Sequence, residues 1–521
     1  MKRLIITIVL WFVCLLFSPG VKAGWVEDVE AFLEASDGAN QKNLIDEIIK
    51  ARPNWEDLVE HLAALSFAPV EPGLYLDTIT CIDGVNRPYV VSIPEGYNPG
   101  VSTPPLVYLH GMVGREVIIP DQLKHAEEHP FVSLGNREGW IVLLPFGQRG
   151  AAWWERVGYT NIHDLVRNLK SKYNIDDDRV WMGGFSDGAS GSFFHAMCLP
   201  TDFASFLALN GHMGVASLDN DQPLYAGNMA TAPVFAITTD KDHYYPTERM
   251  KPSFETAIEA GAEIMLRSLP GEHTWEDIKE EAPNMLAFLK RHPRDPLPAK
   301  FSWETGDVEN FGQCRWFVID EISTAQPEMW HHDYNTTMID STITFGFVND
   351  DTFEGEGMKV GSVNQDKSFM AFQMGLKAGD IIIAGNDIPI LADGDIGIFK
   401  GTLQWGDSVY LRVIRGEKEV LLKGRLPQPR KYLLFKREVP SAKAEIEVVG
   451  NDVNIRTSRV GAFRILVHPD MFRVNRNIKV TVNERVMFDD IVKPDIGFML
   501  GDFRENRDCE LIYINEIKIV L

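Results

Sequence analysis

The chain has 521 residues, of which 45% are hydrophobic, and its formal net charge is −23 at pH 7. A chain of this length and hydrophobic content can build two or three domains with cores of their own, which excludes an intrinsically disordered protein. So acidic a surface repels phosphate backbones and anionic lipid heads, and we therefore expect no nucleic-acid partner.

The first 23 residues have the pattern of a secretory signal peptide. Lys2 and Arg3 precede an apolar run over residues 4–17, and small residues lead to a cleavage point after Ala23. The run is too short for a confident membrane span, and no later stretch approaches the roughly 20 apolar residues that a span needs. We expect an exported protein, periplasmic or extracellular, with no stable membrane insertion after cleavage. An uncleaved anchor is the alternative.

Residues 24–70 are predicted to be helical. Apolar residues recur at helical spacing, as in Val29, Phe32 and Leu33, and Pro53 divides the segment. We expect these helices to pack on the domain that follows them and to take no part in the chemistry.

Residues 71–298 are predicted to form an α/β domain. Strands and helices alternate, which indicates a mostly parallel sheet with helices on both faces. The patterns predict a hairpin and five further strands, at residues 76–80 and 89–93, and then at 104–111, 140–145, 206–210, 234–239 and 262–268. Helices are expected over residues 162–173 and 275–291. Ligands of such sheets bind at the carboxyl ends of the strands, so the side chains there are the candidates for chemistry.

One serine is set apart by its neighbours. Ser186 lies between Gly184 and Gly188 in a G-x-S-x-G pattern, after a short apolar strand and before a helix of small and apolar residues. This pattern is typical of a sharp strand-to-helix turn that exposes the serine hydroxyl. The alternative is an ordinary glycine-rich turn.

Two residues further along the chain are candidates to complete a catalytic triad. His273 lies in a glycine-containing loop after the last predicted strand, and Asp242 follows the strand at residues 234–239. Asp240, at the end of that same strand, is the alternative to Asp242.

An oxyanion hole needs two backbone amides that face the developing negative charge. The amide of Asp187 starts the helix after the serine, and the amide of Met112 lies in a loop with Gly111 and Gly114, whose small size lets the backbone approach the serine. We therefore predict Met112 and Asp187 as the oxyanion donors.

The motifs around these residues resemble those of secreted α/β-hydrolases. They are His110-Gly, Gly184-Phe-Ser-Asp-Gly188, Asp242-x-x-Tyr-Pro and Gly271-Glu-His-Thr-Trp275, in this order and within residues 75–292. The nearest likeness is to bacterial proteins of the feruloyl-esterase, polyhydroxybutyrate-depolymerase and prolyl-oligopeptidase type. The resemblance implies Ser186 as nucleophile, His273 as general base and then acid, and Asp242 as the carboxylate that orients the histidine. Asp187 beside the serine, with Ala189 where many relatives have a second glycine, is a departure from their pattern and is expected to narrow the pocket.

Residues 343–428 resemble a PDZ domain of the bacterial protease type. The likeness rests on Met358-Lys-Val-Gly-Ser-Val363 and Met374-Gly-Leu-Lys-Ala-Gly-Asp-Ile-Ile-Ile383. It implies that Phe345, Gly346 and Phe347 form a loop that binds a peptide C-terminus, with an edge strand to which the peptide adds. The alternative is a PDZ-like fold that only braces its neighbours, since no basic residue adjoins this loop in the sequence.

Residues 299–342 and 429–521 are predicted to be two parts of one small β-sandwich that the PDZ-like segment interrupts. Both parts carry the alternating pattern of strands, as in residues 446–449 and 478–482. Cys314 and Cys509 fall in this one module, which suggests a disulfide between them; unpaired thiols are the alternative. The run from His331 to Asp333 is expected to be a solvated loop and not a metal site, because adjacent strand residues face opposite sides.

Taken together, the patterns predict an α/β-hydrolase fold followed by a PDZ-like domain inserted in a small β-sandwich. The expected function is that of a serine hydrolase that cleaves small-molecule carboxylic esters and needs no cofactor. Trp154, Tyr244 and Trp275 are candidate walls of the substrate pocket, and core packing explains them equally well. A serine peptidase for short peptides and a binding scaffold that acts through its PDZ-like domain are the alternatives.

Overall fold

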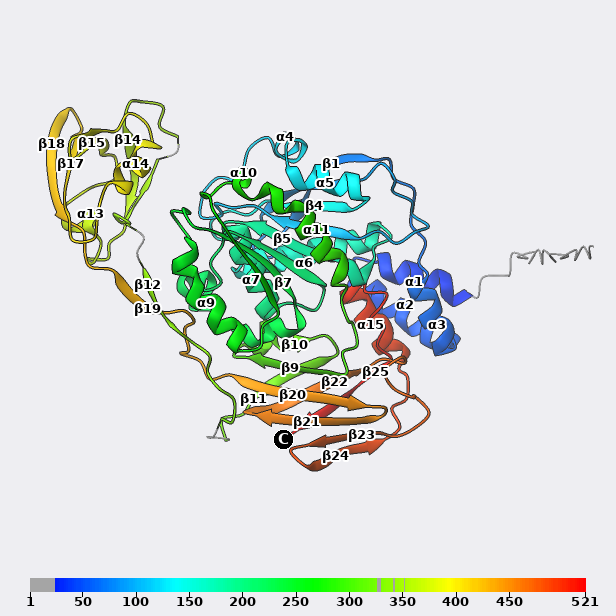
Figure 1. Cartoon of the computed structure of the whole chain (residues 1–521). Helices are drawn as coiled ribbons and strands as arrows, with labels where there is room; N and C mark the ends of the chain where they lie inside the picture. The colour runs from blue at the N-terminus through cyan, green and yellow to red at the C-terminus, as the bar shows by residue number, and fades with distance from the viewer. Residues whose placement is uncertain (1–23, 326–328, 341–342, 351) are drawn as a thin grey trace, which may run out of the picture.

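The computed structural model describes residues 24–325, 329–340, 343–350 and 352–521 (Figure 1). The predicted signal peptide lies outside the described residues. Within them, no helix combines the length and the apolar character that crossing a bilayer requires.

The centre of the molecule is an eight-stranded sheet in the order β1-β2-β4-β3-β5-β6-β7-β8. The two pairings that involve β2 are antiparallel and the other five are parallel. The predicted α/β domain is therefore present, with a mixed sheet. The strands are β1 (Gly73–Thr80), β2 (Asn86–Ile93), β3 (Pro105–Leu109), β4 (Ile141–Pro145), β5 (Trp181–Phe185), β6 (Ser205–Leu209), β7 (Val234–Thr239) and β8 (Ile264–Leu269).

Helices cover both faces of this sheet (Figure 1). The central parallel strands are continuous apolar runs because both of their faces are buried, as in β3 and β6. One face packs against α6 (Arg156–Lys172), α7 (Asp187–Cys198), α8 (Val215–Asn220) and α9 (Thr247–Glu259), and the other against α4 (Gln122–Glu127), α5 (Pro130–Glu138), α10 (Trp275–Ile278) and α11 (Ala282–Arg291).

The last helix of this domain differs from its prediction. A single helix was expected over residues 275–291, whereas the structure has α10, a 3-10 turn at Lys279–Glu281 and then α11. Pro283 lies in the first turn of α11, where its missing N–H costs no hydrogen bond, and it therefore marks the start of a new helix.

The C-terminal half contains two sheets that share one core. A four-stranded sheet has the order β10-β11-β22-β25, and a five-stranded sheet has the order β24-β23-β21-β20-β9. Each sheet joins strands from before residue 343 to strands from after residue 428. The elements are β9 (Lys300–Thr305), α12 (Val308–Phe311), β10 (Gln313–Cys314), β11 (Phe317–Ile322), β20 (Ala442–Val449), β21 (Asp452–Ser458), β22 (Val460–Val467), β23 (Ile478–Val482), β24 (Arg485–Asp490), α15 (Ile496–Asn506) and β25 (Asn515–Val520). We call this part the β module.

The N-terminal helices pack on the β module and not, as expected, on the α/β domain. They are α1 (Gly24–Glu34), α2 (Gly38–Ala51) and α3 (Trp55–Ala63). Their apolar residues, among them Phe32 and Leu58, are buried in the same cluster as the strands of the β module and α15. Arg504 of α15 also donates to the carbonyl of Ala35, which ties the helices to the C-terminal part of the chain.

Residues 343–350 and 352–428 form a separate sheet with its own hydrophobic cluster, which we call the inserted module. Its elements are β13 (Phe347–Asn349), β14 (Met358–Val363), α13 (Met370–Gln373), β15 (Ile381–Gly385), β16 (Ile388–Pro389), α14 (Asp395–Gly401), β17 (Ser408–Arg415) and β18 (Lys418–Arg425). It stands away from the rest of the molecule on a two-stranded ribbon of β12 (Thr337–Asp340) and β19 (Arg430–Leu433) (Figure 1).

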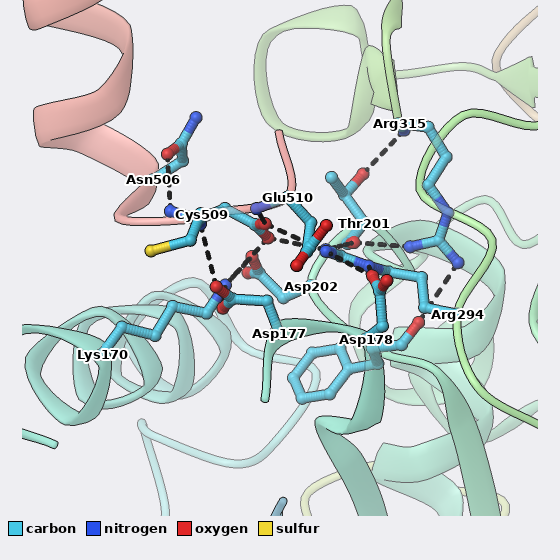
Figure 2. A network of polar contacts seen from close by, with 12 residues as sticks. Lys170, Asp177, Asp178, Thr201, Asp202, Arg294, Arg315, Asn506, Cys509 and Glu510 are labelled. Carbon is cyan, nitrogen blue, oxygen red and sulfur yellow. Dashed lines mark hydrogen bonds and ion pairs between the residues drawn. The ribbon is translucent and has the colours of Figure 1, made fainter. Parts of the chain in front are cut away.

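A buried ionic cluster joins the α/β domain to the β module (Figure 2). Asp508, two residues after the end of α15, accepts hydrogen bonds from Lys170 at 3.0 Å and from both terminal nitrogens of Arg294 at 2.6 and 2.9 Å. Lys170 also lies 2.9 Å from Asp177, and Arg294 also lies 3.0 Å from Asp178. The side chains of Lys170, Arg294 and Asp508 are at most 2% exposed, so these charges depend on one another for solvation.

The predicted disulfide between Cys314 and Cys509 is wrong. All four described cysteines are free. Cys314 faces the α/β domain, where its sulfur lies 4.0 Å from the hydroxyl of Thr231, whereas the Cys509 thiol points at the carbonyl of Leu62 in α3. The two residues share a module but lie against different neighbours, and burial raises the pKa of the Cys314 thiol to about 11.

Candidate active site

Ser186 sits on the sharp turn between β5 and α7. Its φ of 59° and ψ of −119° are unusual for a residue with a side chain, and such strain is typical of a nucleophile elbow. A Cβ on Gly188 would overlap the carbonyl oxygen of Leu109, and one on Gly184 would overlap the backbone of Gly188. Glycine is therefore required on both sides of the serine by close packing of β5, α7 and β3.

The structure brings His273 and Asp242 together. Nδ1 of His273 lies 2.7 Å from Oδ2 of Asp242, whose side chain is fully buried. The other carboxylate oxygen, Oδ1, accepts the backbone amides of Tyr244 at 2.8 Å and Tyr245 at 2.9 Å. The ring of Phe185, the residue before Ser186, lies 4.7 Å from the His273 ring, so the histidine stands beside the elbow.

Asp242 is held in its ionised form. Burial by itself would raise its pKa, but the hydrogen bonds from His273 and from the amides of Tyr245 and Tyr244 outweigh burial and leave the pKa below the usual value. An ionised carboxylate only accepts hydrogen bonds, so Nδ1 of His273 carries a proton and Nε2 is left as a base in the neutral ring.

Asn210 is a residue of this site that the sequence patterns did not reveal. Its Nδ2 donates to Oδ2 of Asp242 at 3.0 Å and to the hydroxyl of Thr239 at 2.6 Å. It follows β6 directly and has a φ of 53°. Its place after a parallel strand, next to Gly211, was the available signal. Asp240, the alternative to Asp242, instead accepts the amide of Gly271 at 2.9 Å.

The loop that holds Met112 is anchored from several sides. Nε2 of His110 accepts the amide of Gly147 at 3.0 Å, and Nδ1 of His110 lies 2.6 Å from the carbonyl oxygen of Gly111. A Cβ on Gly111 would lie 3.0 Å from the Cβ of Ser186, which places this loop directly against the elbow. The side chain of Asp187 reaches the same loop, where its Oδ2 accepts the amide of Val113 at 3.0 Å.

The three candidate pocket residues lie in different surroundings. Tyr244 is 47% exposed, and its ring lies 5.1 Å from that of His273. Trp154 is 5% exposed within the core of the α/β domain, and Trp275 packs 5.4 Å from Phe131 on the other face of the sheet. Of the three, only Tyr244 combines exposure with contact to His273.

The inserted module brings a basic residue to the loop that resembles a peptide-binding loop. Phe345 is buried, Gly346 has a φ of 86°, and Phe347 begins β13. Nζ of Lys400, at the end of α14, lies 5.3 Å from the centre of the Phe345 ring. The sequence had no basic residue beside this loop; the fold supplies one from more than fifty residues away.

The ribbon of the inserted module touches the α/β domain close to the elbow. Nε2 of His212 lies 3.0 Å from the hydroxyl of Tyr432 in β19. The amide of His212 donates to the hydroxyl of Ser190, and the amide of Ser190 donates to the carbonyl of Ser186. His212 and Ser190 therefore connect the ribbon to the turn at Ser186.

In the described part of the chain, no three histidine, cysteine, aspartate or glutamate side chains gather as metal ligands do. The expected solvated loop is wrong for His331, which is 7% exposed and hydrogen bonds to Ser441 at 3.1 Å, while Asp333 pairs with Arg437.

No family model matches the chain. Among curated proteins, the bifunctional acetylxylan esterase/xylanase of Neocallimastix patriciarum is 31% identical over 133 residues, which is 25% of this chain and 18% of that protein. The match thus spans less than a fifth of that relative's length.

Several solved structures resemble a part of this chain. A thermostable esterase shares 19% identity over 42% of this chain and 63% of its own, with a TM-score of 0.35. A ferulic acid esterase shares 17% identity over 42% of this chain and 98% of its own, with the same TM-score of 0.35. A putative dipeptidyl aminopeptidase IV from Bacteroides ovatus shares 17% identity over 42% of this chain and 36% of its own, also with a TM-score of 0.35. The names of these structures denote two esterases and a peptidase.

Proposed function

We propose that this protein is an exported serine hydrolase of the α/β-hydrolase family that cleaves carboxylic esters. The observation that carries the proposal is the 2.7 Å contact between His273 and Asp242 beside the strained turn of Ser186. All three residues follow carboxyl ends of strands in one sheet, in the chain order Ser, Asp, His that α/β-hydrolases use.

The proposed reaction passes through an acyl-enzyme. Oγ of Ser186 attacks the ester carbonyl while Nε2 of His273 accepts the hydroxyl proton, and Asp242 stabilises the imidazolium that forms. The carbonyl oxygen becomes an anion that the amides of Met112 and Asp187 stabilise. The imidazolium then gives its proton to the departing alcohol oxygen. Water, deprotonated by His273, attacks the acyl carbonyl, and the acid leaves as Ser186 regains its proton.

Labelling with a fluorophosphonate probe tests this proposal. We expect the purified mature protein to be labelled at Ser186 and to hydrolyse p-nitrophenyl esters in a series from acetate to octanoate. Ser186→Ala should abolish labelling, and both Ser186→Ala and His273→Ala should lose ester hydrolysis by at least about 10³-fold. Dipeptide p-nitroanilides, run in parallel, test the peptidase alternative. A folded protein that neither reacts with the probe nor turns over any ester would contradict the proposal.

We also propose that the inserted module is a PDZ-like domain that binds a peptide C-terminus. Lys400 is the specific observation in favour, because its ammonium group lies beside Phe345 in the loop that precedes β13. β13 is the edge strand of its sheet, which leaves one side available for an added peptide strand. Burial lowers the pKa of Lys400, so an incoming carboxylate would meet a poorly hydrated cation.

A pair of labelled peptides, one with a free C-terminal carboxylate and one amidated, tests the second proposal. We expect fluorescence anisotropy of a peptide library with apolar C-termini to detect binders that lose at least about tenfold in affinity on amidation and equally with Lys400→Ala. Lys423→Ala is the matched control, since Nζ of Lys423 lies 5.5 Å from the ring of Tyr410, in the strand pair β17 and β18. Equal binding of amidated and free peptides would refute carboxylate recognition.

A further inference from the structure

We propose that the side chain of Asp187 is a positioning residue, which holds the loop after β3 so that the amide of Met112 faces the serine turn. The inference rests on the proposed function, because it assigns a second role to a residue whose own amide is expected to bind the oxyanion.

The Asp187 carboxylate is bonded to the loop and not turned toward solvent. Its Oδ2 accepts the amide of Val113 at 3.0 Å. Asp187 is the first residue of α7, and Val113 lies 74 positions earlier in the chain. The bond therefore joins the two segments that must supply the two donors of an oxyanion hole.

His110 fixes the preceding peptide unit, between Gly111 and Met112. Its Nε2 accepts the amide of Gly147, so Nδ1 carries the ring proton and donates to the carbonyl of Gly111. Burial lowers the pKa of His110 to about 4, which keeps the ring neutral near pH 7. In a trans peptide the carbonyl of Gly111 and the N–H of Met112 point in opposite directions. The N–H of Met112 is thereby turned away from His110 and toward the start of α7.

Met112 itself has little else to hold it. Its φ of 62° is costly for a residue with a side chain, and that side chain is 57% exposed. Val113, by contrast, is 1% exposed and packs in the core of the α/β domain. The carboxylate of Asp187 therefore binds the loop where the strained, exposed Met112 precedes the buried Val113. Without the carboxylate, the amide of Val113 would lose its hydrogen-bond acceptor.

The side chain must act chiefly as a hydrogen-bond acceptor for this role. Burial raises the pKa of Asp187, and the amides of Val113 and Met112 act against that rise. An asparagine has the same shape and keeps one acceptor oxygen for Val113, whereas an alanine keeps none. The two substitutions therefore separate the acceptor from the charge.

Steady-state kinetics of Asp187→Ala and Asp187→Asn test the inference on a p-nitrophenyl ester that the wild-type protein hydrolyses. We expect Asp187→Ala to lower kcat about 10- to 100-fold with KM changed by less than about threefold, because a displaced donor affects the transition state more than ground-state binding. Asp187→Asn should recover most of that loss, with intact mass showing that the introduced amide has not deamidated. Asp219→Ala is the control for charge alone, since Asp219 interacts with Asp187 through its charge, and we expect less than a twofold change.

Hydrogen exchange gives a second readout that needs no turnover. In Asp187→Ala, peptides that contain Val113 should exchange faster than in the wild type, while Asp187→Asn should protect them. If the wild type turns over the ester and Asp187→Ala is as fast or faster, the inference is overturned. The carboxylate then obstructs the site. An Asp187→Asn variant as slow as Asp187→Ala also overturns it. A wild-type protein without labelling or turnover refutes the proposed function instead, and exchange alone then decides whether Asp187 holds the loop.

Discussion

At the scale of single residues, Asp242 is the most constrained group of the candidate site. It accepts four hydrogen bonds, from Nδ1 of His273, from Nδ2 of Asn210 and from the amides of Tyr244 and Tyr245. All four partners are donors, so only a group that accepts with both oxygens satisfies them. The carboxylate is thus fixed in position before any substrate binds.

Asp242→Asn should therefore be far more harmful than its small change in shape indicates. The NH2 group of the new amide would face N–H donors whichever way it is turned. The arrangement that keeps the most hydrogen bonds places it opposite His273, whose Nδ1 must then accept, so that the ring proton moves to Nε2 and the base is lost. We expect kcat for a p-nitrophenyl ester to fall by about 10⁴-fold with little change in the melting temperature. Asp240→Asn is the control, because Asp240 accepts only the amide of Gly271 nearby and should keep kcat within about threefold. Comparable losses in both variants would contradict the assignment of Asp242.

At the scale of secondary-structure elements, the site depends on how closely α7 approaches β3. Gly188, in the first turn of α7, leaves no room for a Cβ beside the carbonyl of Leu109. Gly191, one turn later, would bring a Cβ within 2.6 Å of the Cβ of Trp153. The helix after Ser186 is therefore placed by two contacts that a larger residue would break.

Two helical glycines make a matched test of this packing. Gly188→Ala should lower the free energy of unfolding by about 1–3 kcal/mol, and with it the melting temperature, because the added methyl group forces β3 and α7 apart. Gly501→Ala in α15, where a Cβ would meet no atom within 4 Å, should instead raise stability by about 0.5–1 kcal/mol through its better helix propensity. Thermal unfolding followed by circular dichroism compares them, and a Gly188→Ala protein as stable as Gly501→Ala would refute the packing argument.

The elements that local pattern predicted well are those whose environment is uniform. β3, β5 and β6 are buried on both faces, so their sequences are short apolar runs between turn signals. Ser186, Asp242 and His273 all follow strand ends, which is where the topology of such a sheet puts its ligands. The sequence therefore predicted these strands and the candidate residues that follow them.

What the sequence left open concerns contacts between distant segments. The apolar stripe of α1, which includes Phe32, shows that the helix buries one face. It does not show which segment covers that face, and in the structure the β module covers it. Two cysteines in one module are no evidence that their sulfurs meet, and Cys314 and Cys509 do not. Asn210 and Lys400 gain their partners only when separate elements come together; the place of Asn210 after a strand marks it weakly, and no local pattern marks Lys400.

At the scale of the whole molecule, Lys170 and Arg294 of the α/β domain meet Asp508 of the β module in the buried ion cluster. Burial alone would raise the pKa of Asp508, but Arg294 and Lys170 outweigh burial and hold the pKa below its usual value. A buried cluster of this kind is costly to break, because removing Asp508 leaves two buried cations with fewer partners.

Asp508→Ala should destabilise the protein by about 3–5 kcal/mol, since Lys170 and Arg294 would stay buried without this partner. The control Asp320→Ala removes a half-exposed partner of Arg464 and should cost less than about 1 kcal/mol. The folded-state pKa of Asp508 lies below the unfolded value of about 3.9, so its contribution is complete at neutral pH and is lost as the pH falls below that value. Thermal melts from pH 7 to pH 3 should therefore fall more steeply for the wild type than for Asp508→Ala; parallel curves would contradict the assignment.

The same cluster sets an order of events during synthesis of the chain. Lys170 precedes Asp508 by 338 residues and Arg294 precedes it by 214, so the whole α/β domain leaves the ribosome while both cations still lack Asp508 and have only their acidic neighbours in the α/β domain. Strand β9 likewise cannot pair until β20, its neighbour in the five-stranded sheet, has been synthesised. A nascent chain cut short before α15 therefore has every residue of the candidate site and cannot close the interface behind it. Asp508 and β25 both follow α15, so the interface and the four-stranded sheet are completed only by the last residues of the chain to be synthesised.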